Sequence, residues 1–163
     1  MRVIGIDPGL SGAIAILENN KVIGIFDMPV MAEGKKNKRQ LNSSQLANII
    51  KENTKNVEET VVIVEQVNAM PGQGVTSMFN FGQTFGAIKG VCATLELPIF
   101  FVRPSKWKKH FELINSSKDA SRTKVIEMYP TLSKHLSKKK DVNKSDAILI
   151  ARFFNDTRHL EQN

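Results

Sequence analysis

The chain opens with Arg2-Val3-Ile4-Gly5-Ile6-Asp7-Pro8-Gly9-Leu10-Ser11-Gly12, and the rest of the predicted fold is arranged around this stretch. Its first residues are mostly apolar and β-branched, which predicts a short buried strand that ends at Asp7. The Pro-Gly pair favours a tight turn, and an apolar run at 13–17 follows directly, so we expect a β-hairpin. An acid at the end of a buried strand gains nothing from packing, although a turn-initiating aspartate explains this one position equally well.

A second carboxylate lies in the same kind of place. Residues 61–64 are Val-Val-Ile-Val, the most strongly β-branched run of the chain, and they predict a buried central strand that ends at Glu65. Carboxylates that cluster raise one another's pKa, so they persist only where something neutralises them. Two strand-end acids therefore suggest a site for divalent metal ions.

Length and composition indicate a single domain over residues 1–163, because the chain has no long linker rich in Pro, Gly or Ser. No apolar run is long enough to span a bilayer and no signal segment opens the chain, so we expect a soluble intracellular protein without a membrane partner. The single cysteine, Cys92, excludes a disulfide within the chain and a cysteine-based zinc finger.

The formal net charge of +7 favours a polyanionic partner. A solvated surface loop explains any one basic cluster. Four clusters beside candidate acids make nucleic acid the better interpretation; they lie at 35–39, 103–109, 118–124 and 134–144.

Hydrophobic periodicity and turn residues predict the remaining elements. In chain order we expect a strand at 22–26, a mobile basic loop at 32–42, a helix capped by Ser43 or Ser44, the strand at 61–64, a long helix over 75–96, a strand at 98–102, a short basic helix from Ser105, a helix over 119–129 and a final helix over 143–154.

The long helix carries glycine at every fourth position, at Gly82, Gly86 and Gly90. Each glycine inside a helix costs about 0.5–1 kcal/mol relative to alanine, so such a row calls for a close approach by another element. Two interpretations stay open: packing on the protein's own sheet, or a helix–helix contact in a dimer.

The order of elements resembles the ribonuclease H-like fold. This is an α/β architecture with a five-stranded mixed sheet, whose first three strands are antiparallel, and with helices on both faces. In that arrangement the strand ending at Asp7 lies beside the strand ending at Glu65, and the final helix brings Asp146 over both.

Three motifs make the resemblance specific: Gly5-Ile6-Asp7-Pro8-Gly9, Val64-Glu65-Gln66-Val67 and Ser145-Asp146-Ala147-Ile148-Leu149-Ile150-Ala151. The first alone is weak, because actin-like ATPases begin in a similar way. Together, from Met1 to about Phe154, they resemble the RuvC family of Holliday-junction resolvases, in a phage-type or compact bacterial branch. The resemblance implies a metal-dependent endonuclease that works as a homodimer and nicks two opposed strands of a four-way junction.

The resemblance also implies the metal ligands. It assigns Asp7, Glu65 and Asp146 to two Mg²⁺ ions per subunit, with Mn²⁺ expected to substitute. Many members of the family have Asp or His three residues before the last acid, where this chain has Asn143. We therefore assign the fourth ligand and catalytic role to Asp141, for which a helix-start acid that favours the helix dipole is the alternative.

Basic and apolar residues around these acids have predicted roles in DNA binding. Lys108 is expected to act on the scissile phosphate, with ordinary backbone contact as the alternative. Further expected phosphate contacts are Lys106, Lys109 and Lys124. The loop at 68–74 directly follows Glu65, and Met70 is its large apolar tip, so we expect Met70 to enter the junction as a wedge.

These features predict a structure-selective endonuclease that resolves four-way DNA junctions by paired, metal-dependent phosphodiester hydrolysis. It is expected in the cytoplasm of a bacterium or of a phage-infected host, and no branch-migration motor is assigned as a partner. One alternative is a nuclease of the same fold that acts on structured or precursor RNA. Another, motivated by Asn143, is a non-catalytic junction-binding protein.

Overall fold

The computed structural model describes residues 1–34 and 38–158, so part of the predicted basic loop, at 35–37, lies outside the described residues. Its main sheet has the strand order β3-β2-β1-β6-β7. The first three strands pair in antiparallel fashion, whereas β6 runs parallel to β1, and β7 parallel to β6. The predicted five-stranded mixed sheet is therefore confirmed; its strands are β1 (Arg2–Asp7), β2 (Ala13–Glu18), β3 (Lys21–Asp27), β6 (Thr60–Glu65) and β7 (Ile99–Val102).

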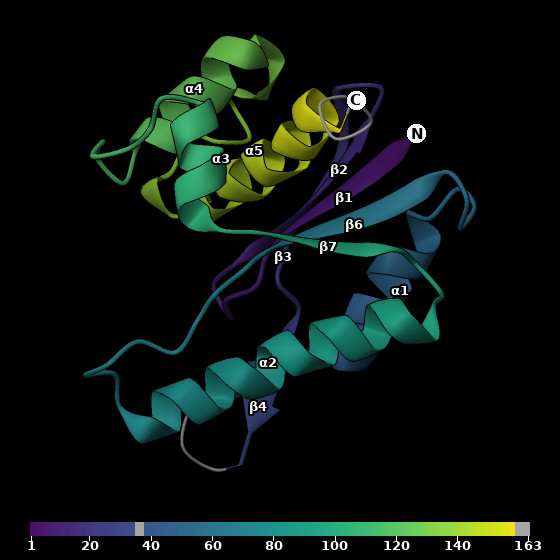
Figure 1. Ribbon diagram of the computed structural model, residues 1–163, viewed down its shortest axis with the longest axis vertical. Helices are drawn as coiled ribbons and strands as arrows, with labels where there is room; N and C mark the ends of the chain where they lie inside the picture. The colour runs from purple at the N-terminus through teal and green to yellow at the C-terminus, as the bar shows by residue number, and fades with distance from the viewer. Residues whose placement is uncertain (35–37, 159–163) are drawn as a thin grey trace.

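Helices cover both faces of this sheet, as predicted (Figure 1). One face packs against α1 (Ser43–Glu52) and α2 (Val75–Thr94), and the other against α3 (Pro104–His110), α4 (Ala120–Met128) and α5 (Val142–Thr157). Two 3-10 turns, η1 (Pro130–Leu132) and η2 (Lys139–Asp141), link α4 to α5. Among the described residues, we find no helix with the length and apolarity that crossing a bilayer requires.

Strand β1 divides its side chains between the two cores. Ile4 and Ile6 are buried in the core under α1 and α2, whereas Val3 belongs to the core under α5. This alternation follows from the period of two along a strand. A buried strand with apolar residues on both faces is what the near-continuous hydrophobic sequence predicts.

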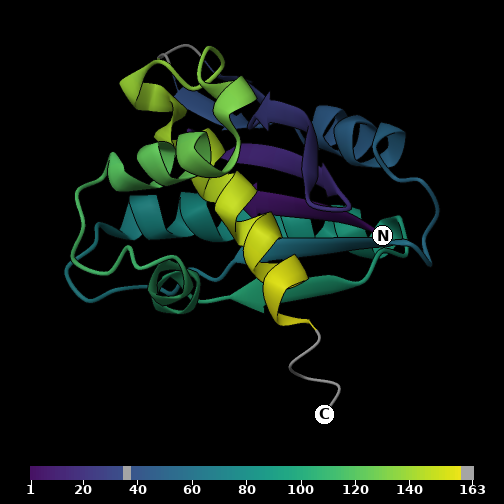
Figure 2. The same ribbon diagram turned by 90° about the horizontal axis from the view of Figure 1, so that it is seen from above.

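The final helix α5 crosses the sheet obliquely (Figure 2) and touches β1 at Gly5. A Cβ at this position would overlap the carbonyl oxygen of Ala147 and lie 2.8 Å from Cβ of Ala151. Only glycine allows the helix to come so close. This contact fixes the position of Asp146, which precedes Ala147 in the helix.

The predicted mobile loop at 32–42 is wrong in its described part. Two short strands, β4 (Val30–Glu33) and β5 (Lys38–Leu41), pair in antiparallel fashion there. Most of their side chains are exposed, so the sequence lacks the alternation that identifies a strand. The helix that follows, α1, is capped by Asn42 and not by Ser43 or Ser44 as predicted. The side chain of Asn42 accepts a hydrogen bond of 3.0 Å from the backbone amide of Gln45.

The glycine row of α2 does not pack on the protein's own sheet. A Cβ at Gly82, Gly86 or Gly90 would meet no atom within 4 Å. The opposite side of the helix is the buried one, with Ile88 and Cys92 in the core. Of the two interpretations, packing within the chain is therefore wrong, and a contact with another molecule stays a prediction.

Candidate active site

Three acidic side chains converge at the carboxyl ends of β1 and β6. Ile6 pairs with Val64 in parallel register, so the next residues, Asp7 and Glu65, leave the sheet side by side. By the alternation of strand side chains they share the face of Val3 and Ile63, which is the face that α5 covers. The close approach of α5 to Gly5 then brings Asp146 over the same edge.

The three carboxylates interact strongly with one another. Burial, followed by repulsion from Glu65 and Asp146, raises the pKa of Asp7 to about 7. Burial and repulsion from Glu65 raise the pKa of Asp146 to about 6. The pKa of Glu65 is also raised by burial. At neutral pH this cluster therefore needs a positive charge to become fully ionised.

Two residues of α3 act on the cluster. The indole Nε1 of Trp107 donates a hydrogen bond of 2.7 Å to Oε2 of Glu65, which lowers the pKa of Glu65 against the effect of burial. The ammonium of Lys108 lowers the pKa of all three carboxyl groups. It also lies 5.4 Å from the centre of the Trp107 ring. From the sequence, Lys108 was predicted to act at the site, whereas no role was predicted for Trp107.

A cavity of about 370 Å³ adjoins Asp146, between α3, α4 and the start of α5. Its lining includes two cations, Lys108 and Lys118, and the hydroxyl residues Ser116, Ser117 and Ser121. Ammonium and hydroxyl donors suit an anionic group such as a phosphate. The sequence gave no site role to Lys118 or Ser121, since charge and polarity alone do not say which side chains face the acids.

The structure does not bring Asp141 into the cluster. Its carboxylate is buried and accepts hydrogen bonds from the Lys138 amide at 2.9 Å and from Nζ of Lys144 at 3.1 Å. Burial raises its pKa, but these two donors outweigh that effect and hold the pKa below its usual value. These contacts support the alternative for Asp141, an acid at the start of a helix, since Asp141 directly precedes α5.

Asn143 connects α5 to the turn that follows Asp7. Its Nδ2 donates a hydrogen bond of 2.6 Å to the carbonyl oxygen of Ser11, and it lines the cavity next to Asp146. The amide oxygen is not used in this contact. Asn143 therefore supports the geometry of the acidic edge by joining two of its elements.

The other predicted DNA contacts lie around the site rather than in it. Lys106 lines a separate cavity beside Phe100 and Phe154, and Lys109 is exposed on α3. Lys124 lines a shallow cavity on α4. Met70 is 60 % exposed in the segment that joins β6 to α2.

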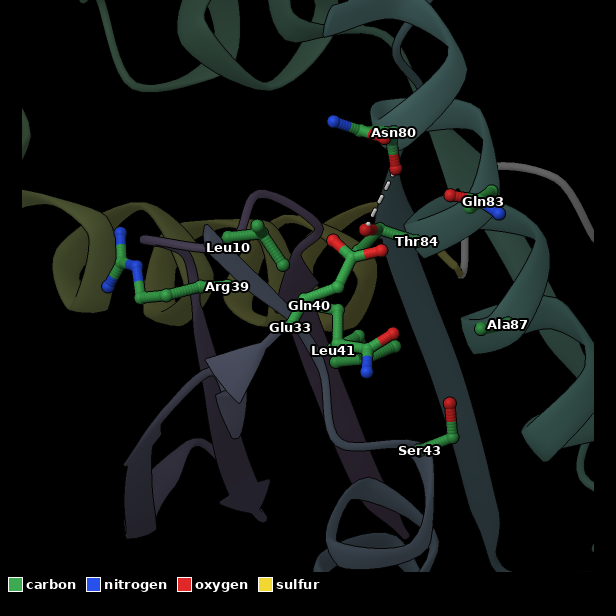
Figure 3. Close-up of a pocket in the computed structure, with 10 residues that line it drawn as sticks. All are labelled: Leu10, Glu33, Arg39, Gln40, Leu41, Ser43, Asn80, Gln83, Thr84 and Ala87. Carbon is green, nitrogen blue, oxygen red and sulfur yellow. Dashed lines mark hydrogen bonds between the residues drawn. The ribbon is translucent and has the colours of Figure 1, made fainter. Parts of the chain in front are cut away.

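A smaller polar cavity, of about 140 Å³, lies between α2 and the β4–β5 hairpin. Figure 3 shows the carboxylate of Glu33 directed toward Thr84 of α2, whereas the guanidinium of Arg39 is directed away from the cavity. None of the three clustered acids lines it. The chemistry of the molecule is therefore expected at the other edge, where Asp7, Glu65 and Asp146 meet.

The donor set of this edge fits a hard divalent cation. Carboxylate oxygens are the ligands that Mg²⁺ prefers, and a cation would offset both the burial and the repulsion that raise the pKa of Asp7. The hydroxyl of Ser121 is buried without a hydrogen-bond partner, yet it is near enough to Asp146 to lower its pKa. Within 1–34 and 38–158, no three Asp, Glu, His or Cys side chains have the spacing of a completed metal site. The fit is therefore one of donor chemistry and charge.

Comparison with known proteins agrees with this geometry. The family model described as "Crossover junction endodeoxyribonuclease RuvC" matches residues 3–153. The chain belongs to the RuvC family. RuvC enzymes are metal-dependent nucleases that resolve Holliday junctions, so the protein is a nuclease of branched DNA. Among curated proteins no relative matches the chain.

Solved structures of RuvC share the fold. The Thermus thermophilus RuvC structure is 17% identical, with a TM-score of 0.56, over 99% of this chain and 97% of that chain. T. thermophilus RuvC in complex with Holliday junction substrate is 16% identical, with a TM-score of 0.56, over 98% of this chain and 96% of that chain. These likenesses confirm the predicted ribonuclease H-like fold.

The raised pKa of Asp7 predicts an unusual dependence of stability on pH. Without metal, the native state holds a proton on Asp7 up to about pH 7, whereas the unfolded chain loses it near the ordinary aspartate pKa of 3.8. The native state thus binds more protons between these values, so stability falls as pH rises. We expect the free energy of unfolding in EDTA, measured with urea, to decrease from pH 5 to pH 8.

The Asp7→Asn variant provides the control for this prediction. It keeps the shape of the side chain but removes its titration, so the fall in stability between pH 5 and pH 8 should become smaller. Added Mg²⁺ should stabilise the wild type at pH 8 more than the variant. An identical pH dependence in both proteins would contradict the assignment of the raised pKa to Asp7.

The Trp107–Glu65 hydrogen bond predicts a kinetic effect. Trp107→Phe keeps an aromatic ring in the core but removes the N–H donor, so the pKa of Glu65 should rise. Loss of a hydrogen bond to a metal-ligating group typically costs about 10–100-fold in activity or metal affinity. We expect junction nicking to slow by about this factor, with the acidic limb of its pH–rate profile shifted to higher pH. A uniform loss at every pH would instead indicate a packing defect.

Proposed function

We propose that this chain cleaves four-way DNA junctions with Asp7, Glu65 and Asp146 as the ligands of its metal ions. The observation that carries the proposal is the convergence of three buried, mutually repelling carboxylates from β1, β6 and α5. Because these ligands come from both ends of the sequence, we propose that residues 1–163 act as one nuclease domain.

We further propose that the ions are two Mg²⁺ per subunit, with Mn²⁺ as a substitute. Bound there, they would activate a water molecule and stabilise the leaving oxygen of an in-line displacement. Water attacks the phosphorus and the bond to the 3′-oxygen breaks, which leaves a 5′-phosphate and a 3′-hydroxyl. The hard oxygen donors and the raised pKa of Asp7 support this choice of ion.

The chain's own residues orient the reacting groups. We propose that Lys108 contacts the scissile phosphate and stabilises its developing charge, because its ammonium acts on all three acids. Lys118 and the hydroxyl of Ser121 would hold the same phosphate in the cavity beside Asp146. Trp107 fixes the orientation of Glu65 through its N–H donor.

Asp141 and Asn143, which the sequence analysis discussed as possible metal ligands, have supporting roles in this proposal. Asp141 forms an ion pair with Lys144, whose Nζ also lies 3.6 Å from Oδ1 of Asp27. These ion pairs order the start of α5. Asn143 ties the same turn to Ser11. We therefore assign both to the positioning of Asp146 rather than to the metal.

The surrounding basic residues would hold the arms of the junction. We propose that Lys106, Lys109 and Lys124 contact phosphates, which favours binding without sequence selection. Met70, exposed directly after the strand of Glu65, is proposed to wedge open the crossover. We place the activity in the cytoplasm of a bacterium or of a phage-infected host, where branched DNA would be available as substrate.

A homodimer fits this activity, because a two-fold junction is cut symmetrically by two sites related by a matching axis. We propose that the outward face of α2 forms the dimer contact. Val75 and Phe79 are 85 % and 65 % exposed, and they continue the open row of Gly82, Gly86 and Gly90. Glycines allow two helix backbones to approach closely, which compensates for their cost in the helix.

Synthetic four-way junctions test the catalytic proposal. We expect paired nicks in Mg²⁺, none in EDTA, and little cutting of linear duplex or structured RNA. Asp7→Asn should retain junction binding but lose at least about 10³-fold in nicking rate, since several kcal/mol of transition-state stabilisation are removed. Preferential RNA cutting would favour the RNA alternative, and an inactive wild type would favour the non-catalytic binding protein.

Light scattering after size exclusion tests the dimer. Gly86→Leu should give a monomer that is folded, because a Cβ at this position would meet no other element of its own chain within 4 Å. The matched control is Thr76→Leu, on the same helix but outside the glycine row. If Gly86→Leu remains a dimer of unchanged affinity, α2 does not form the interface.

A further inference from the structure

Strand β7 is an edge of the main sheet, and among the described residues no other strand pairs with its outer side. The carbonyl oxygens of Pro98 and Val102 accept hydrogen bonds of 2.9 and 2.7 Å from the β6 side. In the regular pattern of parallel strands, the backbone groups of Ile99 and Phe101 therefore point away from β6. They offer donors and acceptors in the spacing that a further strand requires.

A cavity of about 340 Å³ lies at the same edge, on the face of the sheet that α5 covers. Its apolar lining is largely aromatic: the rings of Phe100 in β7 and Phe154 in α5 lie 4.9 Å apart between their centres, and Phe153 also lines it. Figure 2 shows the end of α5 beside β7. Phe100 is 44 % exposed, so the cavity presents aromatic surface to solvent, which is typical of an interaction site.

The charged side chains of this cavity are positive. Lys106 of α3 and Arg158, directly after α5, line it, and none of its described lining residues is acidic. No ion pair within residues 1–34 and 38–158 involves either cation. Lys106 follows the carboxyl end of β7, whereas Arg158 contacts Sδ of Met1, just before the amino end of the parallel strand β1. The two cations therefore lie toward opposite ends of β7.

We propose that the β7 edge binds an extended peptide of a partner protein, in which apolar residues are flanked on both sides by acidic ones. The peptide backbone would pair with Ile99 and Phe101 as an added strand. Every second side chain would then face the cavity, with apolar groups against Phe100 and acidic groups toward Lys106 and Arg158. This inference goes beyond the proposed nuclease function, since none of the three clustered acids lines the cavity.

The chemistry of the edge favours a peptide over two other occupants. Nucleic acid has phosphates that suit Lys106, but its backbone cannot continue a β-sheet and would leave the groups of Ile99 and Phe101 unused. A second copy of the chain, related by a two-fold axis, would bring the Lys106 end of one edge against the Arg158 end of the other. Like charges would then meet, in a protein whose net charge is already +7.

Fluorescence anisotropy with a labelled synthetic peptide tests the proposal on the full chain. The probe is Glu-Asp-Phe-Thr-Phe-Asp-Glu, in which both aromatic residues and the terminal acids fall on one face of a strand. We expect wild-type protein to bind it. Phe100→Glu should weaken binding at least about tenfold, because it places a negative charge in the cavity.

The matched control is Ile23→Glu, which makes the same change of charge. Ile23 is 48 % exposed on β3, the opposite edge strand of the sheet, so peptide affinity should stay within about twofold of wild type. Circular dichroism and thermal unfolding of both variants check that they fold.

Two further measurements separate the proposed binding mode from a local packing defect. Arg158→Glu should weaken binding of the probe, and one of two peptides with lysine in place of the acids at a single end should restore it. Methylation of peptide nitrogens, one at a time, should weaken binding only at alternate residues, because only those donate to the edge of β7.

The proposal is wrong if the probe does not bind up to about 1 mM, if Phe100→Glu and Ile23→Glu lose the same affinity, or if neither lysine peptide restores binding to Arg158→Glu. It is equally wrong if methylation has no alternating effect. Three other outcomes would give the edge a different occupant and so overturn the proposal. A loss of junction affinity in Phe100→Glu as large as the loss of peptide affinity would assign it to DNA, and conversion of a dimer to a monomer would assign it to a second copy. Peptide binding that appears only after Leu160→Ser would assign it to the chain's own residues 159–163.

Discussion

The packing of α5 against Gly5 forces together three carboxylates that repel one another. Helix and strand approach so closely there that no side chain fits between them. Asp146, next to the contact residue Ala147, must therefore share its surroundings with Asp7. Burial, followed by repulsion from Glu65 and then from Asp146, raises the pKa of Asp7 to about 7. The apolar core under α5 supplies the stability that this repulsion removes. If these carboxylates hold the metal ions as proposed, native structure and cation binding are coupled through this one contact.

Because side chains alternate along β1 and β6, the candidate site residues lie on one face of the sheet and the residues that pack against α1 and α2 lie on the other. Asp7 and Glu65 point to the α5 face, where hydrolysis is proposed. Ile6 and Val64, one residue earlier, anchor the sheet on the core of α1 and α2. The segment after Glu65 leads from the catalytic edge into α2, whose outward face is the proposed contact with a second subunit.

The sequence predicted what depends on local pattern and missed what depends on how helices meet. Asp7 and Glu65 were identified as candidate site residues because each ends a run of β-branched residues. The contact of Trp107 with Glu65 joins residues 42 positions apart and requires the placement of α3 on the sheet. The hydrogen bond between Asp141 and Lys144 was not predicted, although the two residues are three positions apart at the start of a helix. The β4–β5 hairpin was missed because its exposed strands lack alternation.

Asn143 illustrates how a neutral residue can serve an acidic site. Its N–H group donates to the carbonyl oxygen of Ser11, which a carboxylate at this position could not do. An aspartate would place a negative charge against that carbonyl and would add a further charge to a cluster that already holds Asp7 partly protonated at neutral pH. The amide instead fastens the first turn of α5 to the turn after β1. In this chain, the hydrogen bond from Asn143 to Ser11 thus takes the place of a fourth negative charge. It connects the helix that carries Asp146 to the turn that follows Asp7.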